Sequence, residues 1–183
     1  VRIKELPSTG ATEADSAPLD QGWKHLYNGL DLRGWKVAAG AEARWKPSNW
    51  NLKLEAAGGQ GSTPLWSEAE ISNGEFIADF QLLKGADLNA PCTGFCVRGQ
   101  ASPAVLIGSG KAPIVFGPDK VKPGKWYRLR LKLEGDTAPD PQPAPPKANT
   151  QVMEATLEGA AKGPVGVADF GTSVTFANFF VRG

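Results

Sequence analysis

Tryptophan and arginine carry the clearest binding chemistry in this sequence, because their spacing gathers them into two short segments. Trp45 and Trp50 bracket the first segment, RWKPSNW, in which Ser48 and Asn49 supply hydrogen-bonding groups. Aromatic rings stack on sugar rings and also anchor protein partners. Nothing in the local pattern requires Trp45 or Trp50 to fill a core. Both are therefore candidates for exposed residues that bind a glycan or a protein.

The second segment runs from Lys111 to Lys132 and contains seven basic residues and only one acidic residue. Within it, Trp126, Arg128, Arg130 and Lys132 alternate with apolar residues and so share one face of an expected strand. The interpretation we favour is a solvated outer face, or a guard against pairing at a sheet edge. The alternative is a dock for an acidic protein surface or for anionic headgroups.

Apolar residues that alternate with polar ones predict an all-β fold. Residues 76–83, 95–98 and 126–133 follow this period of two, and no segment keeps an amphipathic helical period over three turns. The 22 glycines and 15 prolines suit many short strands joined by turns. We predict two stacked antiparallel sheets, with one set of side chains facing the space between them: Phe76, Phe80, Phe95, Val97, Tyr127, Leu129 and Leu131.

The chain divides into an extended N-terminal arm, residues 1–20, and one domain, residues 21–183, with a proline-rich loop at 136–150. The arm opens with VRIKEL, which alternates like a strand but has no hairpin partner in the sequence. Its backbone groups and apolar side chains need partners, so we expect the arm to dock on another chain. The proline-rich loop is a second candidate for such contacts.

The composition limits the partners and the location of the protein. A net charge of +1 argues against a nucleic-acid-binding protein, and no run of eighteen apolar residues predicts a transmembrane helix. The first residue is Val1; a removed signal sequence would explain this, as would a shortened chain, and we expect a periplasmic or secreted protein. Cys92 and Cys96 would lie about 13 Å apart on a straight strand, too far for a disulfide, unless the chain bends between them.

Longer motifs support a family resemblance. Five motifs follow one another in the order found in the 3-keto-disaccharide hydrolase family: LYNGLDLRGW, LWSEAEISNGEFIADFQL, TGFCVR, PGKW and VGVADFGTSVTFANF. The chain resembles this family from Trp23 to the C-terminus, apart from the proline-rich loop. The resemblance implies a concanavalin-like jelly-roll sandwich. It also places Trp35 and Trp66 at signature positions of the fold, where we expect them to fill the core.

The departures from the family pattern concern the positions expected to do chemistry. The polar residues of the family are replaced here by Ala104, Gly108, Ala168, Phe170, Ala177 and Cys92. Only Arg98 and Asn178 keep their residue type, which makes Arg98 a further binding candidate. The replacing side chains cannot transfer the protons that glycoside hydrolysis or elimination requires. We interpret His25 as structural, and four acidic residues as a solvated face: Glu68, Glu70, Glu75 and Asp79.

These observations predict no catalytic residue, no metal site and no cofactor. The leading hypothesis is a non-catalytic accessory or interaction subunit of an extracytoplasmic or membrane-associated assembly, built on a disabled sugar-hydrolase scaffold. A carbohydrate-binding module is the first alternative, and an active keto-disaccharide or glycoside hydrolase is the second, since a fold does not decide among functions.

Overall fold

The computed structural model describes residues 22–56, 64–135 and 150–183. The predicted arm at residues 1–20 and nearly all of the proline-rich loop lie outside the described residues, so the predictions about them stay untested. The described chain forms thirteen strands, and its one helical segment is the three-residue 3-10 helix Glu42–Arg44. No helix in these ranges is long and apolar enough to cross a membrane.

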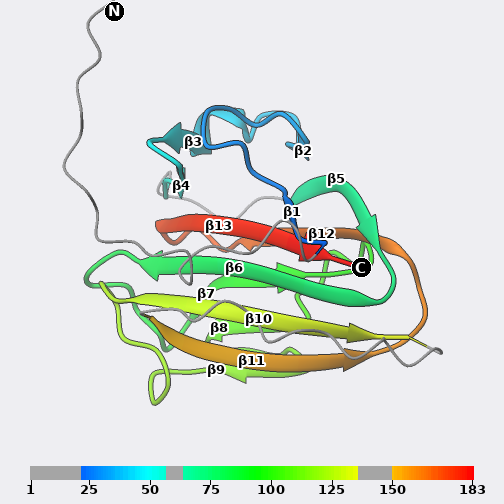
Figure 1. The fold of residues 1–183 in the computed structure, drawn as a ribbon. Helices are drawn as coiled ribbons and strands as arrows, with labels where there is room; N and C mark the ends of the chain where they lie inside the picture. Colours follow the sequence, from blue (N-terminus) through cyan, green and yellow to red (C-terminus); the bar gives the residue numbers. More distant parts are fainter. Residues whose placement is uncertain (1–21, 57–63, 136–149) are drawn as a thin grey trace, which may run out of the picture.

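The strands form two stacked sheets (Figure 1). The seven-stranded sheet has the order β11 (Gln151–Glu158), β10 (Trp126–Glu134), β6 (Gly74–Leu82), β13 (Val174–Arg182), β4 (Asn51–Leu54) and β3 (Trp45–Ser48), and β1 (Lys24–His25) also pairs with β13. The six-stranded sheet has the order β2 (Trp35–Lys36), β5 (Leu65–Ile71), β12 (Gly163–Asp169), β7 (Pro91–Cys96), β8 (Val105–Gly108) and β9 (Ile114–Phe116).

The predicted all-β sandwich is confirmed, with one correction to the strand directions. Each sheet carries one parallel pair at an edge, β10 with β11 and β8 with β9, so both sheets are mixed. The remaining pairs are antiparallel, as predicted. Two parallel neighbouring strands need a connection that leads from the end of the first strand back to the level of its beginning. The sequence between the end of β10 and the start of β11 is long enough for such a connection.

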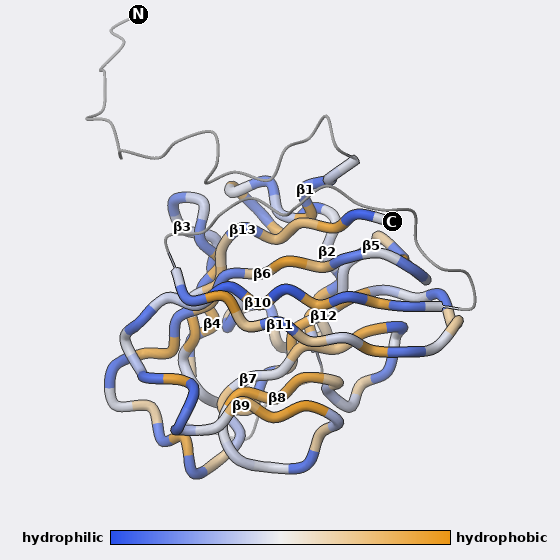
Figure 2. Tube along the Cα trace, turned by 60° about the horizontal axis from the view of Figure 1, so that its bottom comes forward, coloured by the Kyte–Doolittle hydropathy of each residue, from blue (hydrophilic) through white to orange (hydrophobic). Residues whose placement is uncertain are grey.

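Side chains from both sheets fill the space between them. The seven residues predicted to face inward are all buried in one cluster, which confirms the alternation argument. Phe95 of the six-stranded sheet lies between Phe80 and Phe176 of the other sheet, with ring centroids 5.7 and 6.3 Å away. Such offset and edge-on contacts add to the burial of large apolar surfaces. Figure 2 shows hydrophobic segments on strands of both sheets, including β13, β6, β8 and β9.

A β-bulge in β13 changes which side chains reach the outer face. The pairing of β13 with β6 shifts between Ala177 and Phe180, and Asn178 has a positive φ of 52°. The extra residue lets Phe179 enter the core while Phe180 packs on the opposite face with Ile77 and Trp23. A bulge re-aims side chains in this way, and here it brings the amide of Asn178 to Asp79.

Candidate functional site

The outer face of the seven-stranded sheet carries charged side chains that are paired with one another. Arg128 on β10 lies directly opposite Asp79 on β6, and its Nε and Nη2 donate to the two carboxylate oxygens at 2.6 and 2.8 Å. Asn178 Nδ2 donates to the same carboxylate at 2.7 Å. Asp79 and Arg128 are each only 5% exposed. The bidentate pair satisfies both charges, because a guanidinium fork matches a carboxylate.

A second cluster extends across the same face. Arg130 donates to both oxygens of Glu75 at 2.9 Å and to Glu154 on β11, also at 2.9 Å. Arg182 on β13 donates to Glu75 at 3.2 Å, and its guanidinium lies 4.5 Å from the ring of Trp23, a cation–π distance. We call these two clusters together the arginine network.

The arginine network fixes the charge state of Glu75. Burial alone would raise the pKa of this carboxyl, but the hydrogen bonds and charge of Arg130, together with Arg182, outweigh it and lower the pKa. Burial by itself would lower the pKa of Arg130, and its contacts with Glu75 and Glu154 raise it instead. Both partners therefore stay charged at neutral pH.

The network corrects two predictions. Glu75 and Asp79 are buried rather than part of a solvated face, and Arg128 is buried as well. The charge of Arg128 is matched by Asp79, so it adds nothing to a basic surface. Trp126 and Lys132 are half-buried on the same face. A docking role for these two residues stays a prediction.

Two of the positions at which the chain departs from the family pattern, Ala168 and Gly108, lie on strands of the six-stranded sheet. Ala168 on β12 lies beside Gly94 on β7, and Gly94 lies beside Leu106 on β8. A Cβ atom added at Gly94 would come within 2.6 Å of Pro103, so this proline lies directly against the strand. This part of the outer face of the sheet consists of small and apolar side chains, and Gly108 at the end of β8 continues it.

Trp66 lies on this face as well, contrary to the expectation that it fills the core. A Cβ atom at Gly166 would meet the Trp66 ring at 2.6 Å, and the ring is half-buried. Trp35 is buried in the core, as expected. Phe170, which follows β12, is 37% exposed. None of these side chains can donate or accept a proton in catalysis.

Arg98 acts as a clamp between chain segments. Its Nη1 donates to the carbonyl of Glu158 at 2.8 Å, and its Nη2 donates to Glu134 at 3.4 Å and to Gly159. Arg98 follows β7, whereas the carbonyls lie at the ends of β10 and β11, so the guanidinium joins the two sheets at this end. The structure thus engages Arg98 with backbone, and its role in ligand binding stays a prediction.

Trp45 and Trp50 are brought into very different environments. Trp45 is 2% exposed and packs in the core, 6.2 Å from Phe176. The expectation that Trp45 could be exposed is wrong, because its position opposite Leu54 points it inward. Trp50 lies at the tip of the β3–β4 hairpin and is 67% exposed, as the sequence suggested.

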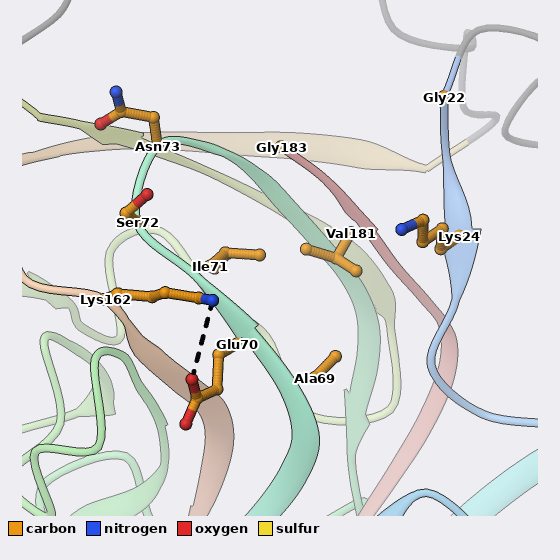
Figure 3. A pocket seen from close by; sticks show the side chains of 10 residues that line it. All are labelled: Gly22, Lys24, Ala69, Glu70, Ile71, Ser72, Asn73, Lys162, Val181 and Gly183. Atoms are coloured by element: carbon orange, nitrogen blue, oxygen red, sulfur yellow. Dashed lines mark ion pairs between the residues drawn. The ribbon is translucent and has the colours of Figure 1, made fainter.

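A pocket of about 270 Å³ opens beside the C-terminal end of β13 (Figure 3). Ile71 and Val181 supply apolar surface, Ser72 and Asn73 lie at the β5–β6 turn, and Lys24 approaches from β1. Lys162 and Glu70 also line the pocket and form an ion pair at 3.9 Å. The pocket can hold a small polar ligand. Glu70 is the one acidic side chain of its lining, so the pocket does not offer the two carboxyl side chains that glycosidases use.

Within the described ranges, no three histidine, cysteine or acidic side chains gather where they could hold a metal ion. Cys92 and Cys96 are both free and buried, and they belong to different sides of β7, since Cys92 is part of the core and Cys96 donates to Ala101 at 3.5 Å. His25 packs edge-on against Phe180 at 4.3 Å, and partial burial lowers its pKa.

The comparisons with known proteins identify a common fold. No protein-family model matches the sequence, and no curated protein matches it. A proposed glycosyl hydrolase of Parabacteroides distasonis superposes with a TM-score of 0.55 at 13% identity, over 90% of this chain and 95% of the other. A second from the same organism gives 0.54 at 17% identity, over 87% and 98%. The chain shares their sandwich fold.

The carbohydrate-binding module CBM66 from Bacillus subtilis is also similar, with a TM-score of 0.49 at 13% identity over 82% of this chain and 96% of the module. At such low identities a shared fold says nothing of a shared site. The expected 3-keto-disaccharide hydrolase family therefore stays a prediction.

Proposed function

We propose that the protein is a non-catalytic accessory domain that acts by binding, within an extracytoplasmic or membrane-associated assembly, on a scaffold with the fold of glycosyl hydrolases. The observation that carries the proposal is the arginine network. Glu75 and Asp79, the carboxylates buried on the outer face of the seven-stranded sheet, are each held by arginine at hydrogen-bonding distance.

A general acid must hold a proton near neutral pH and release it to the substrate. The arginines lower the pKa of Glu75, which is the opposite of what a general acid requires. A nucleophile or base must reach a substrate, and the oxygens of Asp79 are already occupied by Arg128 and Asn178. These carboxylates are suited to holding strands together.

The other sheet supports the same conclusion. Glycosidases place two carboxyl groups roughly 5 to 10 Å apart, with space for the sugar between them. On the outer face of the six-stranded sheet, β7 and β12 present Gly94, Gly166 and Ala168, and Pro103 and Trp66 lie against them. Gly94, Gly166 and Ala168 are buried, and their side chains supply no group for proton transfer.

The test is a turnover assay with the purified full chain. A 3-keto-disaccharide and a set of nitrophenyl glycosides are incubated with the protein, and product is followed by chromatography. We expect no product above the rate without protein. Turnover that scales with protein concentration and is abolished by one point substitution overturns the proposal.

The assembly is tested separately, by deleting residues 1–20. The sequence leads us to expect that the shortened chain keeps the urea midpoint of the sandwich and loses co-purification with its partner. If the shortened chain unfolds, and the full chain runs as an isolated monomer, the accessory role is wrong.

A further inference from the structure

The tip of the β3–β4 hairpin holds a large aromatic side chain in an unfavourable backbone conformation. The strands pair up to Ser48 and Asn51, which leaves a two-residue turn with Asn49 at φ 48° and Trp50 at φ 64°. Turns of this kind need positive φ at both positions, and glycine is the usual second residue. A tryptophan there costs roughly 1 to 2 kcal/mol relative to glycine, so the turn alone does not explain it.

The loop before β2 supports one face of the Trp50 ring. A Cβ atom at Gly29 would lie 2.2, 2.5 and 2.8 Å from three ring atoms that are bonded in a row. Such short distances to three neighbouring atoms require an approach over the ring face. Gly29 is buried beneath the ring, while the ring itself remains exposed. The other face of the indole is therefore open to solvent.

Hydrogen bonds hold the loop around Gly29 in place beneath the Trp50 ring. Trp50 N donates to the carbonyl of Gly29 at 3.3 Å, which ties the hairpin to the loop. The Asn28 side chain accepts from the backbone N–H groups of Leu30 and Asp31 at 2.9 and 3.0 Å, and so holds the loop in its turn. A ligand that stacks on Trp50 meets a ring that is already in place, and this reduces the entropy lost on binding.

The surroundings of the ring indicate the class of ligand. Asp31 and Arg33 form an ion pair at 3.0 Å, so the loop presents no net charge. Asn49 is exposed next to the ring, and its amide has no hydrogen-bond partner within the described segments. The site thus combines a flat apolar face, a neutral surrounding and an amide that can both donate and accept.

We propose that Trp50 and Asn49 bind a sugar ring of an uncharged glycan. The C–H groups on one face of a pyranose carry small positive partial charges that match the negative face of the indole. The hydroxyls at the edge of the sugar can exchange hydrogen bonds with the Asn49 amide. The two charges of the adjacent loop are paired with each other, so the loop favours neither an acidic nor a basic ligand. The inference deepens the proposed function, since it names the ligand of a domain that binds without turnover.

The experiment measures binding of the full chain to polysaccharides by affinity gel electrophoresis. The neutral probes are xyloglucan, galactomannan, soluble starch and a β-1,3-glucan, and polygalacturonate is the acidic probe. The test variant is Trp50→Gly, which removes the ring and suits the positive φ. Trp50→Phe keeps an aromatic ring. Leu30→Ser is the matched control, because Leu30 is 76% exposed and directly follows Gly29, the residue beneath the Trp50 ring.

We expect retardation by at least one neutral polysaccharide. Trp50→Gly should weaken it at least about tenfold, the scale of a central aromatic contact; Trp50→Phe should weaken it less, and Leu30→Ser should leave it unchanged. The urea midpoint of Trp50→Gly should not fall below that of the parent, because glycine suits the positive φ; a midpoint at or above the parent's shows that the loss of binding is not unfolding.

Three results overturn the inference: no retardation by any neutral polysaccharide, equal retardation of Trp50→Gly and the parent, or a loss in Leu30→Ser as large as in Trp50→Gly. The last result would show that retardation depends on the exposed apolar surface of the loop in general and not on the Trp50 ring. Product formation is measured on the same samples. A catalytic protein would form product whether or not retardation depends on Trp50. Failure of the inference is therefore distinguishable from failure of the proposed function.

Discussion

Replacing Glu75 by glutamine tests whether the arginine network holds the sandwich together. Glu75 accepts three hydrogen bonds from Arg130 and Arg182, whose side chains are only 12% and 5% exposed. Glutamine keeps the shape but removes the negative charge, so Arg182 loses the carboxylate it pairs with and Arg130 keeps only the exposed Glu154. Breaking a buried ion pair from one side costs about 3 to 5 kcal/mol. We expect about 3 kcal/mol, because the glutamine oxygen still accepts a hydrogen bond.

The assay is urea unfolding followed by tryptophan fluorescence, with the slope of the transition as a check on two-state behaviour. For a chain of this size, 3 kcal/mol corresponds to a fall of roughly 6 to 12 °C in melting temperature. Glu70→Gln is the matched control. Its carboxylate pairs with Lys162 at 3.9 Å, and the two side chains are 54% and 66% exposed. An exposed pair contributes about 1 kcal/mol at most.

The pH dependence of the same measurement has a definite sign. The pKa of Glu75 is lower in the folded protein than its usual value of 4.5. A lowered pKa adds stability that is fully present above pH 4.5 and is lost as the pH falls through the folded-state pKa. The parent should therefore lose more stability than Glu75→Gln when the pH falls below 4.5. A change of less than about 1 kcal/mol at pH 7, as in the control, would refute the role assigned to the network.

Three further outcomes follow from the structure. Gly29→Ala should displace the Trp50 ring and so weaken glycan binding. Because Gly29 has φ +81°, the substitution should also lower the free energy of unfolding by about 1 to 2 kcal/mol, measured in urea. Unchanged glycan binding would contradict the ring placement. Arg98→Ala should speed hydrogen exchange at the C-terminal ends of β10 and β11, since it frees three backbone carbonyls; equal protection there would show that the clamp is dispensable. Burial raises the pKa of Cys96 to about 12, so iodoacetamide at pH 8 should modify it only after unfolding; rapid labelling of the native protein would contradict this burial.

The parts of the fold that repeat locally could be predicted from the sequence. Alternation along residues 76–83 and 126–133 assigned the inward face of β6 and β10 correctly, because a buried face gives a period of two. The parallel edge strands could not be predicted in the same way. Parallel and antiparallel neighbours bury the same alternating faces, so the pattern of β11 does not reveal its direction.

Which side chains meet in the arginine network is decided by the register of the strands more than by residue type. Arg128 and Asp79 are 49 positions apart, and only the pairing of β10 with β6 places them opposite each other. A row of basic residues on one strand looked like an exposed basic face because the acids that neutralise it come from a distant strand.

Trp45 and Trp50 show the same limit at short range. They are close in sequence, yet Trp45 lies on β3 and faces the core, whereas Trp50 lies in the hairpin turn itself and is exposed. Asn49 is the one local signal for this turn, since asparagine tolerates positive φ. The following tryptophan obscured it, because glycine is the usual residue at that position.

Saturation-transfer NMR of a neutral oligosaccharide in the presence of the full chain tests the central claim most directly, because one spectrum reports both contact and chemical change. The probe is an oligosaccharide from whichever neutral polysaccharide retards the protein most. We predict saturation transfer to the sugar C–H groups, its loss in Trp50→Gly, and anomeric signals that stay unchanged during prolonged incubation. New anomeric signals that grow with protein concentration, or equal transfer in the parent and in Trp50→Gly, would contradict it.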